Sequence, residues 1–170
     1  MGNGQKFAKF GFNGNVCAGG SSMQADEFQP GIYRHYNNGK LYFASEIREN
    51  NTSGELCVCY DALYSGTKRG YWKPFSEFGE IKLRENQKPV PRFTLVKALP
   101  VEKMQMLLPG KKFNYCHNRR WRICEITEVF WDESLKIALK DPRGEKLVLP
   151  LSSWEFFLRA PCQQAYPATD

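Results

Sequence analysis

The sequence lacks the short patterns that mark common catalytic and metal sites. It has no Gly-rich phosphate loop, no nucleophile elbow and no His-x-x-x-His pair, and only His35 and His117 supply imidazoles. Its six cysteines form no Cys-x-x-Cys pair and no zinc-finger spacing. We therefore expect no catalytic residue, no cofactor and no metal site, and we expect the protein not to be an enzyme.

Long apolar runs are also missing. No stretch approaches the roughly 18 apolar residues of a membrane span. The first residues do not combine a basic segment with an apolar one, as a secretory signal does. The sequence therefore predicts a cytoplasmic protein with no membrane association.

What the chain does contain is a tandem repeat, because the segment Gly31–Phe78 recurs at Gly110–Trp154. A shift of 79 positions aligns Pro30-Gly31 with Pro109-Gly110, Glu46-Ile47 with Glu125-Ile126, and Leu56, Val58 and Tyr60 with Leu135, Ile137 and Leu139. A shift of 76 then aligns Pro74-Phe75-Ser76 with Pro150-Leu151-Ser152. Such agreement at apolar and turn positions indicates two copies of one small fold.

Each copy shows short alternating strands separated by turn residues, the pattern of a small barrel. The expected fold is all-β, with two tandem SH3-like barrels and short helical turns. We divide the chain into a flexible N-terminal arm (1–29), a first module (30–96), a linker (97–108), a second module (109–160) and a C-terminal tail (161–170).

The first module also carries a specific resemblance. The segments that carry it are Tyr33-Arg34-His35-Tyr36, Glu55–Tyr60, Leu63-Tyr64, Lys73-Pro74 and Pro91-Arg92-Phe93. They resemble a small bacterial SH3-like family of unknown function, with the pattern Y-R-H-Y-K, V-V-Y-x-x-L-Y, W-V-R-P-x-x-M-F and P-R-F. The resemblance covers about residues 31–96 and implies a fold without implying a reaction. It departs at Tyr71-Trp72-Lys73-Pro74, where the family has W-V-R-P.

The net charge of +6 is concentrated in a segment where cations and rings alternate. Cations neutralise phosphates and flat rings stack on bases, so the mixture favours nucleic-acid binding. The predicted nucleic-acid residues are Lys111, Lys112, Arg119, Arg120, Arg122, Trp121, Lys68, Arg69 and Lys73.

Two alternatives stay open beside nucleic acid. In one, an aromatic pocket binds a small molecule, a nucleotide or a peptide through Tyr33, His35, Tyr42, Tyr64, Tyr71 and Trp72. In the other, the protein is an enzyme whose reaction carries no recognisable motif. The oligomeric state does not follow from the sequence.

Overall fold

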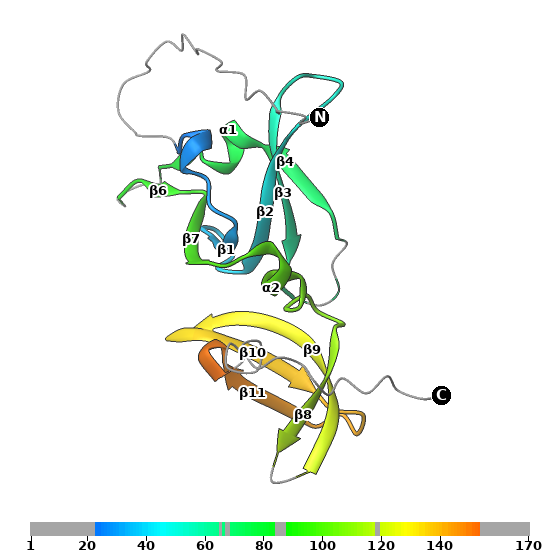
Figure 1. The fold of residues 1–170 in the computed structure, drawn as a ribbon. Coiled ribbons are helices and arrows are strands. Elements are labelled where there is room, and N and C mark those ends of the chain that lie inside the picture. Colours follow the sequence, from blue (N-terminus) through cyan, green and yellow to red (C-terminus); the bar gives the residue numbers. More distant parts are fainter. Residues whose placement is uncertain (1–22, 65, 67–68, 84–87, 118–119, 154–170) are drawn as a thin grey trace, which may run out of the picture.

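The computed structural model describes residues 23–64, 66, 69–83, 88–117 and 120–153, with the side chains of 115–117 and 120–122 left aside. Strands make up 51% of it and the helices are short, so the expectation of an all-β protein is confirmed at the level of fold class. The strands form two larger antiparallel sheets, one above and one below the short helix α2 in Figure 1, and a small two-stranded sheet.

The first sheet is built from the first copy and has the strand order β4-β3-β2-β1-β7. Its strands are β1 (Gly31–His35), β2 (Leu41–Glu49), β3 (Leu56–Ala62), β4 (Tyr71–Pro74) and β7 (Phe93–Ala98). Between β4 and β7 the chain forms α1 (Phe75–Phe78) and a two-stranded ladder of β5 (Ile81–Lys82) and β6 (Val90–Pro91). A 3₁₀ turn, η1 (Ala25–Glu27), precedes the sheet.

The second sheet is built from the second copy and has the order β11-β10-β9-β8. Its strands are β8 (Lys112–His117), β9 (Arg120–Asp132), β10 (Ser134–Lys140) and β11 (Lys146–Pro150). A helical turn at 151–153 follows β11, as α1 follows β4. The helix α2 (Val101–Gln105) connects β7 to the second sheet.

The pairing registers of the two sheets can be compared position by position, and they correct one part of the alignment. Tyr60 pairs with Tyr71 and Leu139 pairs with Leu147, which keeps the predicted shifts of 79 for β3 and 76 for β4. Along β2, however, the shift is different. Ala44 pairs with Tyr60, and Ile126 pairs with Leu139, the residue that corresponds to Tyr60. Ala44 therefore corresponds to Ile126, which is a shift of 82.

The shift changes because the hairpins differ in length. The β2–β3 connection spans residues 50–55, whereas Glu133 alone, at φ 58°, joins β9 to β10. Glu46 therefore corresponds in the ladder to Glu128, and the expected equivalence of Glu46 with Glu125 is wrong. Apolar alternation does not report turn length, which sets hairpin register.

The inner face of the first sheet holds an aromatic core. Its buried members are Tyr33, Ala44, Val58, Phe78 and Phe93. The Phe78 and Phe93 rings stack with centroids 4.3 Å apart and planes 5° from parallel, and Tyr33 meets Phe78 edge-on at 5.2 Å. Burying large rings gives this small module much apolar area from few residues.

A second core lies between the two sheets. The inner face of the second sheet contributes Ile126, Ile137 and Leu139, and the segment from α2 onwards contributes Met104 and Leu107. The outer face of the first sheet completes the same cluster with Ile32, Leu41, Phe43 and Leu63. The Val129 amide also donates to the Leu63 carbonyl at 2.7 Å. The second copy therefore fills its core partly with residues of the first.

Candidate functional site

Exposed lysines form a row across the outer face of the second sheet. Lys112 of β8 lies opposite Glu125 of β9, Glu125 lies opposite Lys140 of β10, and Lys140 lies opposite Lys146 of β11. All four side chains are exposed. We call Lys112, Lys140 and Lys146, with Glu125 between them, the basic row. It carries three positive charges and one negative charge.

The pairing of Lys140 with Lys146 is unfavourable for the sheet itself. Like charges directly opposite each other in an antiparallel pair are destabilising, and opposite charges would be stabilising. No ion pair joins either lysine to another residue in the described part of the chain. Favourable pairing within the sheet therefore does not account for this arrangement.

Arg69, in the connection between β3 and β4, lies beside one end of this sheet. The Arg69 guanidinium donates to the Pro109 carbonyl, two residues before Lys111. Lys111 is exposed, and its amide and carbonyl bond within the chain to Leu108 and Ile126. The predicted cations Arg69, Lys111 and Lys112 are thus brought to the junction of the two copies.

Other predicted nucleic-acid residues fall outside what the structure describes. Lys68 and Arg119 lie outside the described residues altogether. The backbones of Arg120, Trp121 and Arg122 pair with β8, and their side chains lie outside the described part. Lys73 lies on the first sheet and binds Glu77 at 2.5 Å, so it is apart from the basic row.

A second group of polar and aromatic side chains gathers at one end of the first sheet. At this end β1 and β3 finish and β2, β4 and β7 begin. The Tyr42 and Tyr64 hydroxyls lie 2.8 Å apart, and the Asn38 amide donates to the Tyr42 hydroxyl at 3.2 Å. The Lys40 ammonium lies 4.1 Å from the centroid of the Tyr64 ring.

The same end carries His35 and a stacked tyrosine pair. Tyr60 and Tyr71 stack with centroids 5.6 Å apart, and the Tyr60 ring also meets Tyr42 edge-on at 5.7 Å. The His35 ring lies 4.9 Å from Phe93. We call His35, Tyr42, Tyr60, Tyr64 and Tyr71 the tyrosine end; all five are half-buried.

A cluster of ion pairs lies beside the tyrosine end, and the charges of two of its members, Arg92 and Lys73, act on His35. Lys73, Lys82 and Arg92 share two carboxylates, Glu77 and Glu80, which leaves one excess positive charge. The Arg92 Nη1 lies 3.1 Å from a Glu80 oxygen, while its buried Nε has no hydrogen-bond partner among the described residues.

These surroundings change the protonation of the groups at this end. Burial lowers the pKa of His35, and the charges of Arg92 and Lys73 lower it further against an opposing hydrogen bond from Asn38. The imidazole is therefore neutral near pH 7. Burial also raises the pKa of Tyr60 and of Tyr64, so both hydroxyls keep their protons and remain donors.

Two members of the predicted aromatic pocket lie elsewhere. Tyr33 is only 1% exposed and its hydroxyl donates to the Gln29 carbonyl at 2.7 Å, so it belongs to the core. Trp72 is 60% exposed and lies opposite Cys59, on the outer face of β4. The structure brings His35, Tyr42, Tyr64 and Tyr71 together and separates them from these two.

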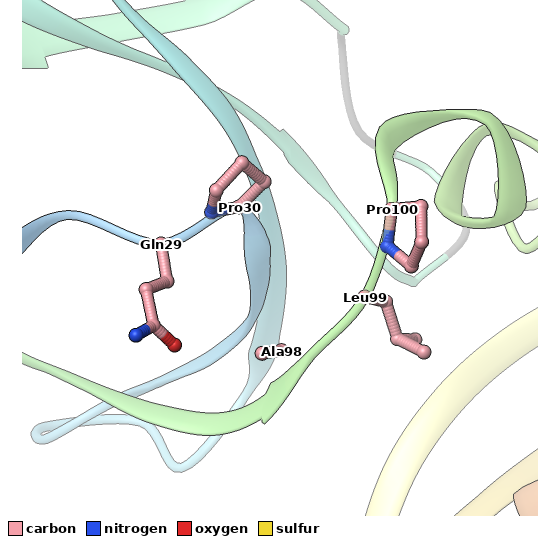
Figure 2. Close-up of a pocket in the computed structure, with 5 residues that line it drawn as sticks. All are labelled: Gln29, Pro30, Ala98, Leu99 and Pro100. Carbon is pink, nitrogen blue, oxygen red and sulfur yellow. The ribbon is translucent and has the colours of Figure 1, made fainter.

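A shallow hollow lies where the chain enters β1 and leaves β7. Its volume is about 350 Å³, and Figure 2 shows its lining of Gln29, Pro30, Ala98, Leu99 and Pro100. The lining offers apolar contact and one amide, with no titratable group.

The described part of the chain has neither a cluster of metal ligands nor a membrane-spanning helix. No group of three or more His, Cys, Asp or Glu side chains there is placed to hold a metal ion. No helix within the described ranges is long and apolar enough to cross a membrane.

Comparison with known proteins gives one match. The family described as Protein of unknown function (DUF1653) matches residues 31–95. This chain thus contains a DUF1653 domain, which spans β1 to β7 and includes the tyrosine end. Neither a search of curated proteins nor a search of solved structures found a match.

Sequence reasoning missed several residues of both surfaces. Lys140 and Lys146 are separated from the basic segment in the chain and join it only through strand register. Tyr60 and Arg92 stand in the resembling segments, but nothing in the sequence places them beside His35. The aligned segments could have pointed to the tyrosine end, because Tyr60 and Tyr71 of the first align with Leu139 and Leu147 of the second.

Proposed function

We propose that this protein is a non-catalytic binding module that holds nucleic acid on the basic row of its second sheet. The observation that carries the proposal is the placement of Lys140 directly opposite Lys146 on an exposed face, in line with Lys112. Such a row costs stability in the free protein, and phosphates would neutralise it.

The junction extends this surface toward the first copy. Arg69, held at the Pro109 carbonyl, and the exposed Lys111 add two cations next to Lys112. Together with Lys140 and Lys146 they make five cations from both copies, with Glu125 the acid within the row. Arg119 and the side chains of Arg120, Trp121 and Arg122 lie outside the described part, and they stay predicted members of this surface.

We further propose that each copy is an SH3-like barrel. The strand order of β4-β3-β2-β1 is repeated in β11-β10-β9-β8, and each copy places a helical turn after its short fourth strand. In the first copy β7 adds a fifth strand beside β1 and contributes Phe93 to the core. A short turn between closely spaced strands around a single apolar face suits that architecture.

The test compares double charge-reversal variants that all change the net charge of the protein by the same amount. We expect Lys140→Glu with Lys146→Glu to weaken binding of a fluorescent 20-base oligonucleotide measured by anisotropy across several salt concentrations. The slope of log K against log salt is negative, and each lost phosphate contact reduces its magnitude by about 0.7 for a single strand. Losing two contacts should therefore reduce the magnitude of the slope by about 1.4. Lys111→Glu with Lys112→Glu and Arg119→Glu with Arg120→Glu should act in the same direction.

The matched control is Arg48→Glu with Lys88→Glu, two exposed cations of the first copy that change net charge equally. Its affinity and salt slope should stay close to those of the wild type. Equal losses in the control and in the Lys140/Lys146 variant would reduce the effect to overall charge. Wild-type protein that binds neither single-stranded nor duplex oligonucleotide would refute the proposal.

A further inference from the structure

The two copies differ at the positions that form the tyrosine end. Tyr60 and Tyr71 correspond in the ladder to Leu139 and Leu147, which pair with each other in the same way. Tyr42 corresponds to Cys124 by the shift along β2, and Lys73 to Leu149. The second copy thus forms the same strands with small or aliphatic side chains.

The same strand pairing thus forms with leucine or with tyrosine at these positions. In the second copy the aliphatic side chains lie in or against the core between the sheets. In the first copy Tyr42 and Tyr60 pack with one edge against the core that Phe78 and Phe93 close, and they stay half-buried. Half-buried rings with polar tips are typical of binding surfaces, where one end is apolar and the other meets solvent.

We propose that the tyrosine end binds a small planar anion, an aromatic ring that bears a phosphate or a carboxylate. The Tyr60–Tyr71 stack offers a ring face for the planar part. Lys40, which lies over Tyr64, would attract the acidic part, together with Arg92 and Lys73, whose charges act on His35.

The neutral His35 and the protonated tyrosines fit this ligand. The pKa of His35 is lowered, first by burial and then by the charges of Arg92 and Lys73. An anion bound beside it would oppose that effect and raise the pKa of His35. The Tyr60 hydroxyl keeps its proton, because burial raises its pKa, and supplies a donor that needs no change of charge to bind an oxygen of the ligand.

The experiment uses three probes: adenosine 5′-monophosphate, benzoate and uncharged adenosine. Calorimetry measures affinity, and NMR follows the His35 ring signals. We expect at least one of the two anions to bind and to raise the pKa of His35, and adenosine to bind more weakly than its monophosphate. Binding by the monophosphate alone would indicate a phosphate ligand, and binding by benzoate alone a carboxylate ligand.

The decisive variant copies the second repeat into the first. Tyr60→Leu with Tyr71→Leu should lower affinity for the bound anion by tenfold or more, because the stacking surface is lost. Trp72→Ala is the matched control, since Trp72 is an exposed ring on the other face of the same strand. If the double variant does not fold, Lys73→Leu, which copies Leu149, replaces it and should weaken anion binding with little change for adenosine.

Three results would overturn the inference. They are the absence of binding by both anions, unchanged affinity in a folded Tyr60→Leu/Tyr71→Leu variant, and equal losses in Trp72→Ala. None of them bears on the basic row, because Lys112, Lys140 and Lys146 lie on the other sheet. Failure of the oligonucleotide test would likewise leave this inference standing.

Discussion

Ser45 and Thr127 make the same hydrogen bond in the two copies. Each sits at a β-bulge, and its hydroxyl donates to a carbonyl of the neighbouring strand: Ser45 to Cys59 at 3.2 Å and Thr127 to Ala138 at 3.1 Å. A bulge leaves one residue unpaired in the ladder, and a hydroxyl at that residue supplies a donor to the adjacent strand. The bulge and its hydroxyl are thus common to both copies.

Removing the Thr127 hydroxyl should therefore destabilise the protein. We expect Thr127→Val to lower the free energy of unfolding by about 1 kcal/mol, because the Ala138 carbonyl loses a donor while side-chain volume is kept. Urea denaturation followed by circular dichroism measures the change. Thr127→Ser keeps the hydroxyl and serves as the control; a loss in the serine variant as large as in the valine variant would contradict this explanation.

Close packing at Gly31 gives a second prediction. A Cβ at this position would lie 2.5 Å from the Lys97 carbonyl oxygen and 2.7 Å from Leu95 Cδ1. Gly31→Ala should force β1 away from β7 and lower the free energy of unfolding by about 1–3 kcal/mol. Gly79→Ala is the comparison, because its Cβ would meet Met23 Cβ at 3.2 Å. Unfolding curves in which Gly31→Ala costs no more than Gly79→Ala would show that β1 and β7 separate easily.

The shared core predicts that the two sheets unfold together. Leu107 is 1% exposed and belongs to the cluster that joins both sheets. Leu107→Ala should cost about 2–5 kcal/mol and leave a single transition. Near-ultraviolet circular dichroism, which reports on aromatic rings of both segments, should then give the same transition as the far-ultraviolet signal. Two separate transitions in the wild type would mean that the copies are independent units.

The surroundings of His35 predict a titration below the usual range. With a folded pKa below the unfolded value near 6.5, neutral His35 favours the folded state, and this contribution is full above pH 6.5. It is lost as the pH falls through the folded pKa. We expect Arg92→Gln to raise the pKa of His35 by removing a nearby charge, as measured by NMR titration. His117 is the second histidine of the chain and gives an internal reference. An unchanged His35 midpoint would rule out an effect of Arg92.

Much of the fold could be predicted because apolar alternation and turn residues are local. The short strands and helical turns expected from the sequence are present, for example at Tyr71–Pro74 and Phe75–Phe78. The register of β2 could not be obtained this way. In the sequence, Glu46-Ile47 matches Glu125-Ile126 at a shift of 79 positions. In the structure, the bulge at Ser45 and the shorter second hairpin impose a shift of 82 positions along this strand.

The candidate surfaces were less predictable, for a related reason. Lys140 and Lys146 adjoin Lys112 only across strands, so reading the chain as a line leaves them out. The aromatic set was placed on one surface because the residues are all rings, and strand alternation separates Trp72 from Tyr71 by putting them on opposite faces. Whether these surfaces bind nucleic acid or a small anion stays a prediction.

The aliphatic inner face of the second sheet has a consequence for stoichiometry. Leu139 occupies the place of Tyr60, and it is fully buried against the first copy and the segment that follows α2. The described part of the chain therefore has two sheets of similar strand order and one tyrosine end. A saturating titration with a planar anion should reach a single molar equivalent per chain.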